Sequence, residues 1–315
     1  MSDSWESAVQ VRRSCVACGS EGLRRLRRYA AAGLVRCDRC GLTFSGWRPT
    51  DVELQLHYGG YGDWPDSPLT RTRYREVLDG LRPYRCTGRV FDLGCGAGYF
   101  LEEAAEAGWE PYGSTVGGLS IEMCHTKGLN VVSADAASDS FPAGHFDAAT
   151  AFEVVEHLVA PAVEASLLST IVRPGGVFYC TTPNFNSLTR HLLASDWRVI
   201  SYPEHLVYFT AGTLASWLRP FGFQLQKLET TGISPGELQR AIRRRVLHAG
   251  GDRHAAANPG GAGAVRDLDE RIRGAIESGY LLPVGKRLLN GALTGVKLGD
   301  TLKAWFVRMP EAVTG

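Results

Sequence analysis

From Arg89 onward, short apolar runs alternate with helix-forming segments, and this alternation restricts the fold more than any other feature of the chain. The predicted strands are 89–93, 110–114, 130–133, 146–152, 176–181 and 223–229, and the predicted helices are 99–107, 119–127, 161–171 and 213–219. Strand and helix in repeated succession are typical of parallel βαβ units. The sequence therefore predicts an α/β fold with a doubly wound sheet.

The C-terminal third of the chain departs from this alternation. Leu302–Val307 is an alternating apolar run that we expect to be the seventh and last strand, so that residues 232–297 form a helical insertion before it. The insertion contains a basic predicted helix, Glu237–His248, and an apolar stretch, Tyr280–Leu298. We expect it to cap the substrate site, because insertions on loops near a ligand site carry function. The alternative is that the basic helix and the apolar stretch dock on a membrane or mediate dimerisation.

Two Cys-x-x-Cys pairs lie near the N-terminus, within residues 11–48. Cys15 and Cys18 are separated from Cys37 and Cys40 by 18 residues, the spacing of a ribbon that delivers four thiolates to one tetrahedral metal. Zinc is the expected metal, and iron is its chemical rival because tetrahedral sulfur coordination suits both. A four-cysteine site has no open position, so its role should be structural.

Charge and composition limit the classes of partner. The formal net charge is +1, which gives no global reason to expect nucleic acid, although the ribbon carries a local basic cluster at Arg24, Arg25, Arg27 and Arg28. That cluster predicts either a solvated face or a contact with RNA phosphates. No apolar run is long enough for a membrane span, and Met1–Gln10 does not resemble a signal peptide, so we expect a cytoplasmic protein.

A glycine-rich turn follows the first predicted strand. Its residues are Asp92-Leu93-Gly94-Cys95-Gly96-Ala97-Gly98, and they lead directly into a predicted helix. Glycines at this point let a ligand approach the backbone at the helix N-terminus. With this fingerprint, the chain resembles the class I S-adenosylmethionine (SAM)-dependent methyltransferases, which have a Rossmann-like seven-stranded sheet. The resemblance implies a SAM-binding domain formed by residues 88–231 and 298–310, with Asp92, Gly94, Cys95, Gly96 and Gly98 at the cofactor.

The same resemblance implies further cofactor contacts. In this family an acidic residue at the end of the second strand holds the ribose, but here that position is Thr115, which offers one hydroxyl in place of a carboxylate. Asp135 and Ala136 match the adenine-contacting segment, Phe152 ends the fourth predicted strand, and Glu153 follows it. Residues 49–87 are expected to form a helical linker and lid, from which Tyr61 covers the sulfonium.

Two motifs imply the type of reaction. The segment 146–158 resembles ubiquinone-type small-molecule methyltransferases, and Tyr202-Pro203-Glu204-His205, together with the ribbon, resembles the deoxysugar C-methyltransferases. Those enzymes carry a Tyr-His-Glu-His run, so Pro203 replaces one histidine. The resemblance implies that His205 is the general base, that Glu204 orients its tautomer and that Tyr202 positions the substrate.

These observations predict methyl transfer to a small-molecule biosynthetic intermediate, at carbon or oxygen. A nucleotide-linked sugar or another natural-product precursor is the expected acceptor class. An RNA methyltransferase that uses the basic ribbon is one alternative. A SAM-fold protein without methyl transfer is another, motivated by the missing acid at Thr115. The sequence leaves the oligomeric state open, including a homodimer.

Overall fold

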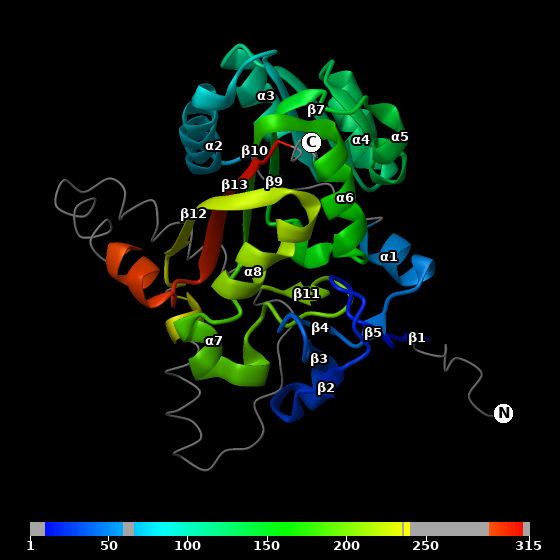
Figure 1. The fold of residues 1–315 in the computed structure, drawn as a ribbon, viewed down its shortest axis with the longest axis vertical. Helices are drawn as coiled ribbons and strands as arrows, with labels where there is room; N and C mark the ends of the chain where they lie inside the picture. Colours follow the sequence, from blue (N-terminus) through cyan, green and yellow to red (C-terminus); the bar gives the residue numbers. More distant parts are fainter. Residues whose placement is uncertain (1–9, 59–65, 235, 240–289, 311–315) are drawn as a thin grey trace, which may run out of the picture.

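The computed structural model describes residues 10–58, 66–234, 236–239 and 290–310. Its centre is a seven-stranded sheet in the order β12-β13-β10-β9-β6-β7-β8 (Figure 1). The strands are β6 (Arg89–Leu93), β7 (Glu110–Thr115), β8 (Asn130–Ser133), β9 (Phe146–Phe152), β10 (Val172–Pro183), β12 (Phe223–Thr231) and β13 (Thr301–Arg308). Strand β13 runs antiparallel to β10 and β12, whereas β6 to β10 pair in parallel. The predicted seven-stranded α/β sheet is confirmed.

Helices cover both faces of the sheet. One face carries α2 (Pro68–Leu81), α3 (Tyr99–Glu106) and α4 (Gly118–Thr126); the other carries α5 (Ala137–Ser140), α6 (Pro161–Ile171) and α8 (Ala211–Trp217). Side chains of a strand point alternately to the two faces. In β10, Val177 and Tyr179 therefore pack with the first set of helices, and Phe178 and Cys180 pack with the second.

The element boundaries differ from the prediction where turn chemistry decides them. Strand β10 begins at Val172 rather than Gly176, and its pairing with β9 shifts register between Val172 and Val177. Helix α8 begins at Ala211 rather than Thr213, because Thr210 and Thr213 form a reciprocal capping box. The remaining short elements are η2 (Arg82–Tyr84), η3 (Ala134–Ala136), η4 (Val155–His157), η5 (Ala194–Asp196), η6 (Arg219–Phe221), α1 (Asp51–Tyr58) and α7 (Leu188–Leu193).

The cysteine-containing segment supplies three strands of a second, four-stranded sheet, and β11 supplies the fourth, in the order β11-β4-β3-β2. Its strands are β2 (Leu23–Arg25), β3 (Leu34–Cys37), β4 (Thr43–Ser45) and β11 (Val207–Tyr208), with η1 (Arg27–Ala32) between β2 and β3. A two-stranded pair, β1 (Gln10–Val11) with β5 (Trp47–Arg48), flanks it. Strand β11 lies beside β4 at the bottom of the large sheet (Figure 1), although it follows β10 by more than twenty residues in the chain.

Part of the predicted insertion lies outside the described residues. Within the described part, residues 236–239 and 290–296 are helical. The rest of the predicted basic helix Glu237–His248, beyond Gln239, lies outside the described residues, as does Tyr61. Among the helices that the structure describes, none has the length and apolar character needed to cross a membrane.

Candidate active site

The glycine turn between β6 and α3 depends on positive backbone φ angles. Gly94, Gly96 and Gly98 have φ angles of 75°, 51° and 80°. The backbone N–H groups of Gly94 and Cys95 both donate to the carbonyl of Ser114, at 2.8 and 2.9 Å, so the turn is tied to β7. A Cβ atom built on Gly94 would lie 2.6 Å from Cγ2 of Val154. This position therefore requires glycine for two reasons, its φ angle and its packing.

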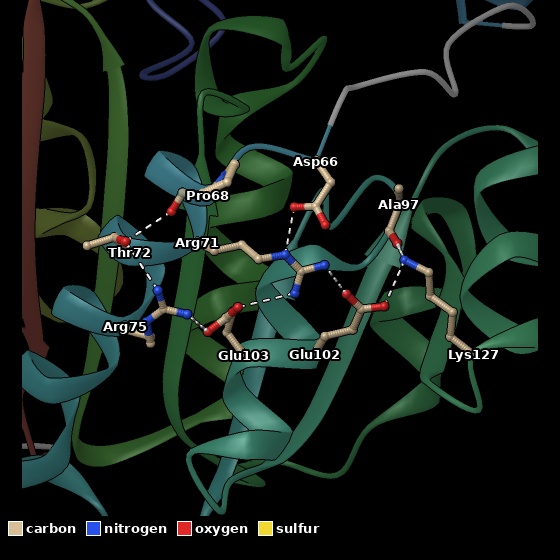
Figure 2. Close-up of polar contacts among 9 residues, drawn as sticks. All are labelled: Asp66, Pro68, Arg71, Thr72, Arg75, Ala97, Glu102, Glu103 and Lys127. Carbon is tan, nitrogen blue, oxygen red and sulfur yellow. Dashed lines mark hydrogen bonds and ion pairs between the residues drawn. The ribbon is translucent and has the colours of Figure 1, made fainter. Parts of the chain in front are cut away.

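A charged network braces the turn from outside (Figure 2). Lys127 donates to the carbonyl of Ala97 at 2.9 Å and pairs with Glu102 at 2.9 Å. Arg71, from α2, bridges Asp66, Glu102 and the buried Glu103 at 2.6, 2.6 and 3.2 Å. Its hydrogen bond to Asp66 holds the pKa of that carboxyl below its usual range. The network connects α2, α3 and α4 to the glycine turn, and no sequence motif indicates it.

Asp92 is the penultimate residue of β6, just before the glycine turn, and is almost completely buried. Its Oδ1 accepts a hydrogen bond from Thr150 Oγ1 at 2.6 Å. Burial raises the pKa of Asp92 to about 8, because desolvation disfavours the ionised form more than the hydrogen bond favours it. The raised pKa favours the protonated form of Asp92 at pH 7, and a cation bound nearby would favour its ionisation.

The ends of the parallel strands gather the other predicted cofactor residues at one sheet edge. Thr115 ends β7, and its hydroxyl is oriented toward the Val116 carbonyl at 3.4 Å. The buried Ser114 Oγ has no hydrogen-bond partner among the described residues. Asp135 and Ala136 lie in η3, directly after β8, and both are exposed. The structure thus brings these segments to the same edge as the glycine turn.

Strand β9 ends at the same edge in a backbone conformation that is uncommon for a residue with a side chain. Glu153 has a φ angle of 53°, and its N–H donates to both the carbonyl and the hydroxyl of Thr181, each at 3.1 Å. Such outliers often occur at functional sites. Three residues later, the buried Glu156 accepts from Thr182 Oγ1 at 2.9 Å, and burial raises its pKa well above the usual value.

Two histidines face each other next to Glu156. The rings of His157 and His205 lie 4.7 Å apart in an edge-to-face arrangement. Nδ1 of His157 donates to the carbonyl of Glu204 at 2.8 Å, and Nδ1 of His205 donates to the carbonyl of Val199 at 2.6 Å. A carbonyl can only accept, so each ring carries its proton on Nδ1. It is Val199, rather than Glu204 as the sequence predicts, that sets the tautomer of His205.

Burial keeps both rings neutral at pH 7. Desolvation lowers the pKa of His157 to about 4 and also lowers the pKa of His205 below its usual 6.5. A carboxylate oxygen of Glu156 and one ring nitrogen each of His157 and His205 all lie within 4.8 Å of one another. Both histidines therefore present an unprotonated Nε2, which is the form a general base requires.

Residues from the N-terminal segments complete this cluster. The hydroxyl of Tyr58, at the end of α1, lies 3.4 Å from Nδ1 of His157. Tyr202 has its hydroxyl 3.4 Å from Glu53, also in α1, and its ring 5.5 Å from that of Trp47. The carboxylate of Glu204 accepts from Ser201 Oγ at 3.0 Å. The sequence prediction named Tyr202, Glu204 and His205 as the catalytic residues. It expected Tyr58 in a lid over the cofactor and did not place Tyr58 or Glu156 beside the histidines, because no local motif shows these contacts.

The four ribbon cysteines converge as their spacing predicts. The Sγ atoms of Cys15 and Cys40 are 3.5 Å apart, those of Cys18 and Cys37 are 3.7 Å apart, and all four lie within 4.8 Å of one another. A tetrahedral metal with Zn–S bonds of about 2.3 Å places its sulfurs about 3.8 Å apart. Gly19 and Gly41, both with positive φ, close the two turns by donating to Cys15 and Cys37 carbonyls. This donor set fits a zinc ion.

Known proteins match the chain over the region that contains this site. A family model described as a methyltransferase domain matches residues 70–228, half of the chain. The ubiquinone biosynthesis O-methyltransferase of Methylococcus capsulatus is 31% identical over 162 residues, which cover 47% of this chain and 68% of the relative. The chain belongs to the class I SAM-dependent methyltransferases.

Solved structures show the same fold as this methyltransferase. A SAM-dependent methyltransferase from Archaeoglobus fulgidus has a TM-score of 0.50 and 22% identity, covering 81% of this chain and 99% of its own. The cyclase SpnF has a TM-score of 0.51 and 18% identity, covering 83% of this chain and 97% of its own. These similarities concern the fold alone. They agree with the seven-stranded sheet described above.

The buried Asp92 leads to a prediction about how this methyltransferase binds SAM. SAM carries a net positive charge, which favours the ionised form of a nearby carboxyl. Because the pKa of Asp92 is raised to about 8, SAM binding near pH 7 should be coupled to proton release, so the affinity should increase as the pH rises toward 8 and level off above it. Calorimetry at several pH values, in buffers of different ionisation enthalpy, measures both effects. Asp92→Asn should abolish them, and an unchanged pH dependence in this variant would refute the assignment.

Proposed function

We propose that this methyltransferase transfers the methyl group of SAM to a small-molecule biosynthetic intermediate, with His205 as the general base. The observation that carries the proposal is the pair of neutral histidines, His157 and His205, at the sheet edge where the glycine turn also opens. A base next to the acceptor removes the proton that a hydroxyl or an acidic carbon must lose. The relatives named ubiquinone biosynthesis O-methyltransferases support a small acceptor.

The cofactor niche is assigned to residues at the ends of the parallel strands. We assign it to Asp92, Gly94, Cys95, Gly96, Gly98, Thr115, Asp135, Ala136, Phe152 and Glu153. When bound there, SAM supplies an electrophilic methyl group on a positively charged sulfur. The glycine turn offers backbone N–H groups at the N-terminus of α3, where the helix dipole favours negative groups such as a carboxylate.

The chain's own groups then handle the acceptor. His205 Nε2 takes the proton of the acceptor as the new bond to the methyl carbon forms, and the electron pair of the broken carbon–sulfur bond remains on sulfur. The hydrogen bond from Nδ1 to the Val199 carbonyl stabilises the resulting imidazolium and holds the ring in place. Tyr58 is the last residue of α1, and Tyr202 contacts the same helix through Glu53. We assign them to positioning of the acceptor.

The acceptor class follows from this arrangement. A neutral base beside the buried Glu156, whose pKa is raised by burial, suits an acceptor hydroxyl or a carbon next to a carbonyl, since both lose a proton during methylation. A nucleotide-linked keto-sugar or a related natural-product precursor provides such a carbon, and a phenol provides such a hydroxyl.

We also assign zinc to Cys15, Cys18, Cys37 and Cys40, in a structural role.

The test is a transfer assay with SAM labelled in its methyl group. The purified protein is incubated with phenolic acceptors, with nucleoside-diphosphate keto-sugars and, separately, with RNA. We expect label in one small-molecule class and none in RNA. Label in RNA alone would support the nucleic-acid alternative. SAM binding without transfer to any acceptor, together with unaltered recovery of SAM, would contradict the proposal.

A further inference from the structure

The strand that follows His205 belongs to the ribbon sheet. Val207 and Tyr208 of β11 pair with Phe44 and Thr43 of β4, and β11 is an edge strand of that sheet. The backbone of Leu206 binds both the catalytic domain and the ribbon. Its N–H donates to the carbonyl of Glu156 at 2.8 Å, and its carbonyl accepts from the N–H of Ser45 at 2.8 Å. The main chain beside His205 is thus held between η4, which follows β9, and the ribbon.

The cysteine cluster determines the position of β4. Cys37 is the last residue of β3, and the turn that contains Cys40 leads into β4 at Thr43. Within this turn Cys37 N–H donates to the Leu42 carbonyl at 2.9 Å. Strands β3 and β4 are only four and three residues long, too short for a stable hairpin of their own. A metal ion that joins both ends of the ribbon supplies the missing constraint.

The ribbon core and the core of the catalytic domain are continuous. Cys15, Cys37 and Phe44 belong to the same buried cluster as Leu206 and Val207, and this cluster extends to β9, β10 and α6. A second contact joins the N-terminal segment to the same region, because Arg12 Nη2 donates to the carbonyl of Val159 at 3.0 Å. A displacement of β4 therefore cannot leave the 199–208 segment in place.

From these contacts we propose that the metal-loaded ribbon is a positioning element of the catalytic site, which holds His205 through β4 and β11. Metal at the four cysteines fixes the β3–β4 turn, β4 fixes β11, and β11 fixes the loop that carries His205. Among the described residues, the backbone of the glycine turn is hydrogen-bonded to Ser114 of β7 and to Lys127, not to the ribbon. Loss of the metal should thus impair the chemical step and spare SAM binding. The inference rests on the proposed role of His205.

The experiment compares two cysteine variants of the full chain. Cys18→Ser removes one ribbon ligand, and Cys86→Ser, at an exposed cysteine outside the ribbon, is the matched control. Bound metal, amide hydrogen exchange, SAM affinity and the rate of methyl transfer are measured for each. Wild-type protein is also stripped with a chelator and reloaded with zinc, which provides the same comparison if Cys18→Ser does not fold.

We expect metal loss to accelerate exchange by about tenfold or more in residues 199–209, with little change in β6 and β9. SAM affinity should remain within about twofold, while the rate of transfer falls at least about tenfold and returns on reloading. Metal loss with unchanged exchange in 199–209 would overturn the inference. Equal acceleration in β6 and β9 would also overturn it, because the ribbon would then stabilise the whole domain. The exchange result does not depend on the chemistry of His205. It therefore tests the link between ribbon and loop even if His205 is not the general base.

Discussion

Gly94→Ala is expected to weaken SAM binding at least about 100-fold. A methyl group at this position meets Cγ2 of Val154 at 2.6 Å, and the φ angle of 75° is one that residues with a Cβ adopt only at a cost. The turn must move to relieve the contact, and this displaces the backbone that lines the proposed cofactor niche. Isothermal titration with SAM measures the loss, and thermal unfolding measures the accompanying destabilisation.

Gly128→Ala is the matched control for this substitution. Gly128 has a φ angle of 73° and no atom within 4 Å of a built Cβ, so this variant isolates the cost of positive φ, about 1 kcal/mol. It should lower stability without affecting SAM binding. Adding Val154→Ala to Gly94→Ala removes the clashing side chain and should restore part of the affinity. SAM affinity equal to wild type in Gly94→Ala would show that the niche lies elsewhere.

His205→Asn is expected to lower kcat by about 10²- to 10⁴-fold, the usual contribution of a general base. Asparagine keeps an N–H donor for the Val199 carbonyl but has no basic nitrogen. SAM affinity should be unchanged, because the glycine turn does not contact this loop in the described hydrogen bonds. Steady-state kinetics and titration with SAM measure the two effects separately.

The pH profile provides an independent readout of the same residue. Burial lowers the pKa of His205, so the neutral, basic form persists to lower pH than for a free histidine. For wild type, kcat should therefore be constant near neutral pH and fall only below pH 6.5, as His205 becomes protonated. His191→Asn, at an exposed histidine of α7, should leave rate and profile unchanged. Wild-type activity in His205→Asn would remove His205 from the reaction.

The strands and helices of the large sheet could be predicted because their signals are local. The apolar run Phe146–Phe152 and the glycine turn at Gly94 each restrict their own backbone, whatever surrounds them. Strand β11 could not be predicted in this way, because a strand of two residues has no periodicity. Its pairing with β4 depends on a contact between segments that lie far apart in the sequence.

The catalytic cluster was predicted only in part for the same reason. The run Tyr202-Pro203-Glu204-His205 marks the segment, but nothing in it indicates that Val199 binds the ring or that His157 lies beside it. The local order of residues made Glu204 the expected partner. The loop instead folds back so that the Val199 carbonyl is nearer to Nδ1.

By itself the sequence determined the order of strands and helices, the glycine turn and the four-cysteine spacing, since backbone sterics and metal geometry act over a few residues. Only the tertiary structure decided which groups meet: His157 with His205, Arg71 with Glu102 and Glu103, and the ribbon with the strand that follows His205. Those contacts depend on how separate segments pack. Burial, which lowers the pKa of His205 and raises that of Asp92, arises from the same packing.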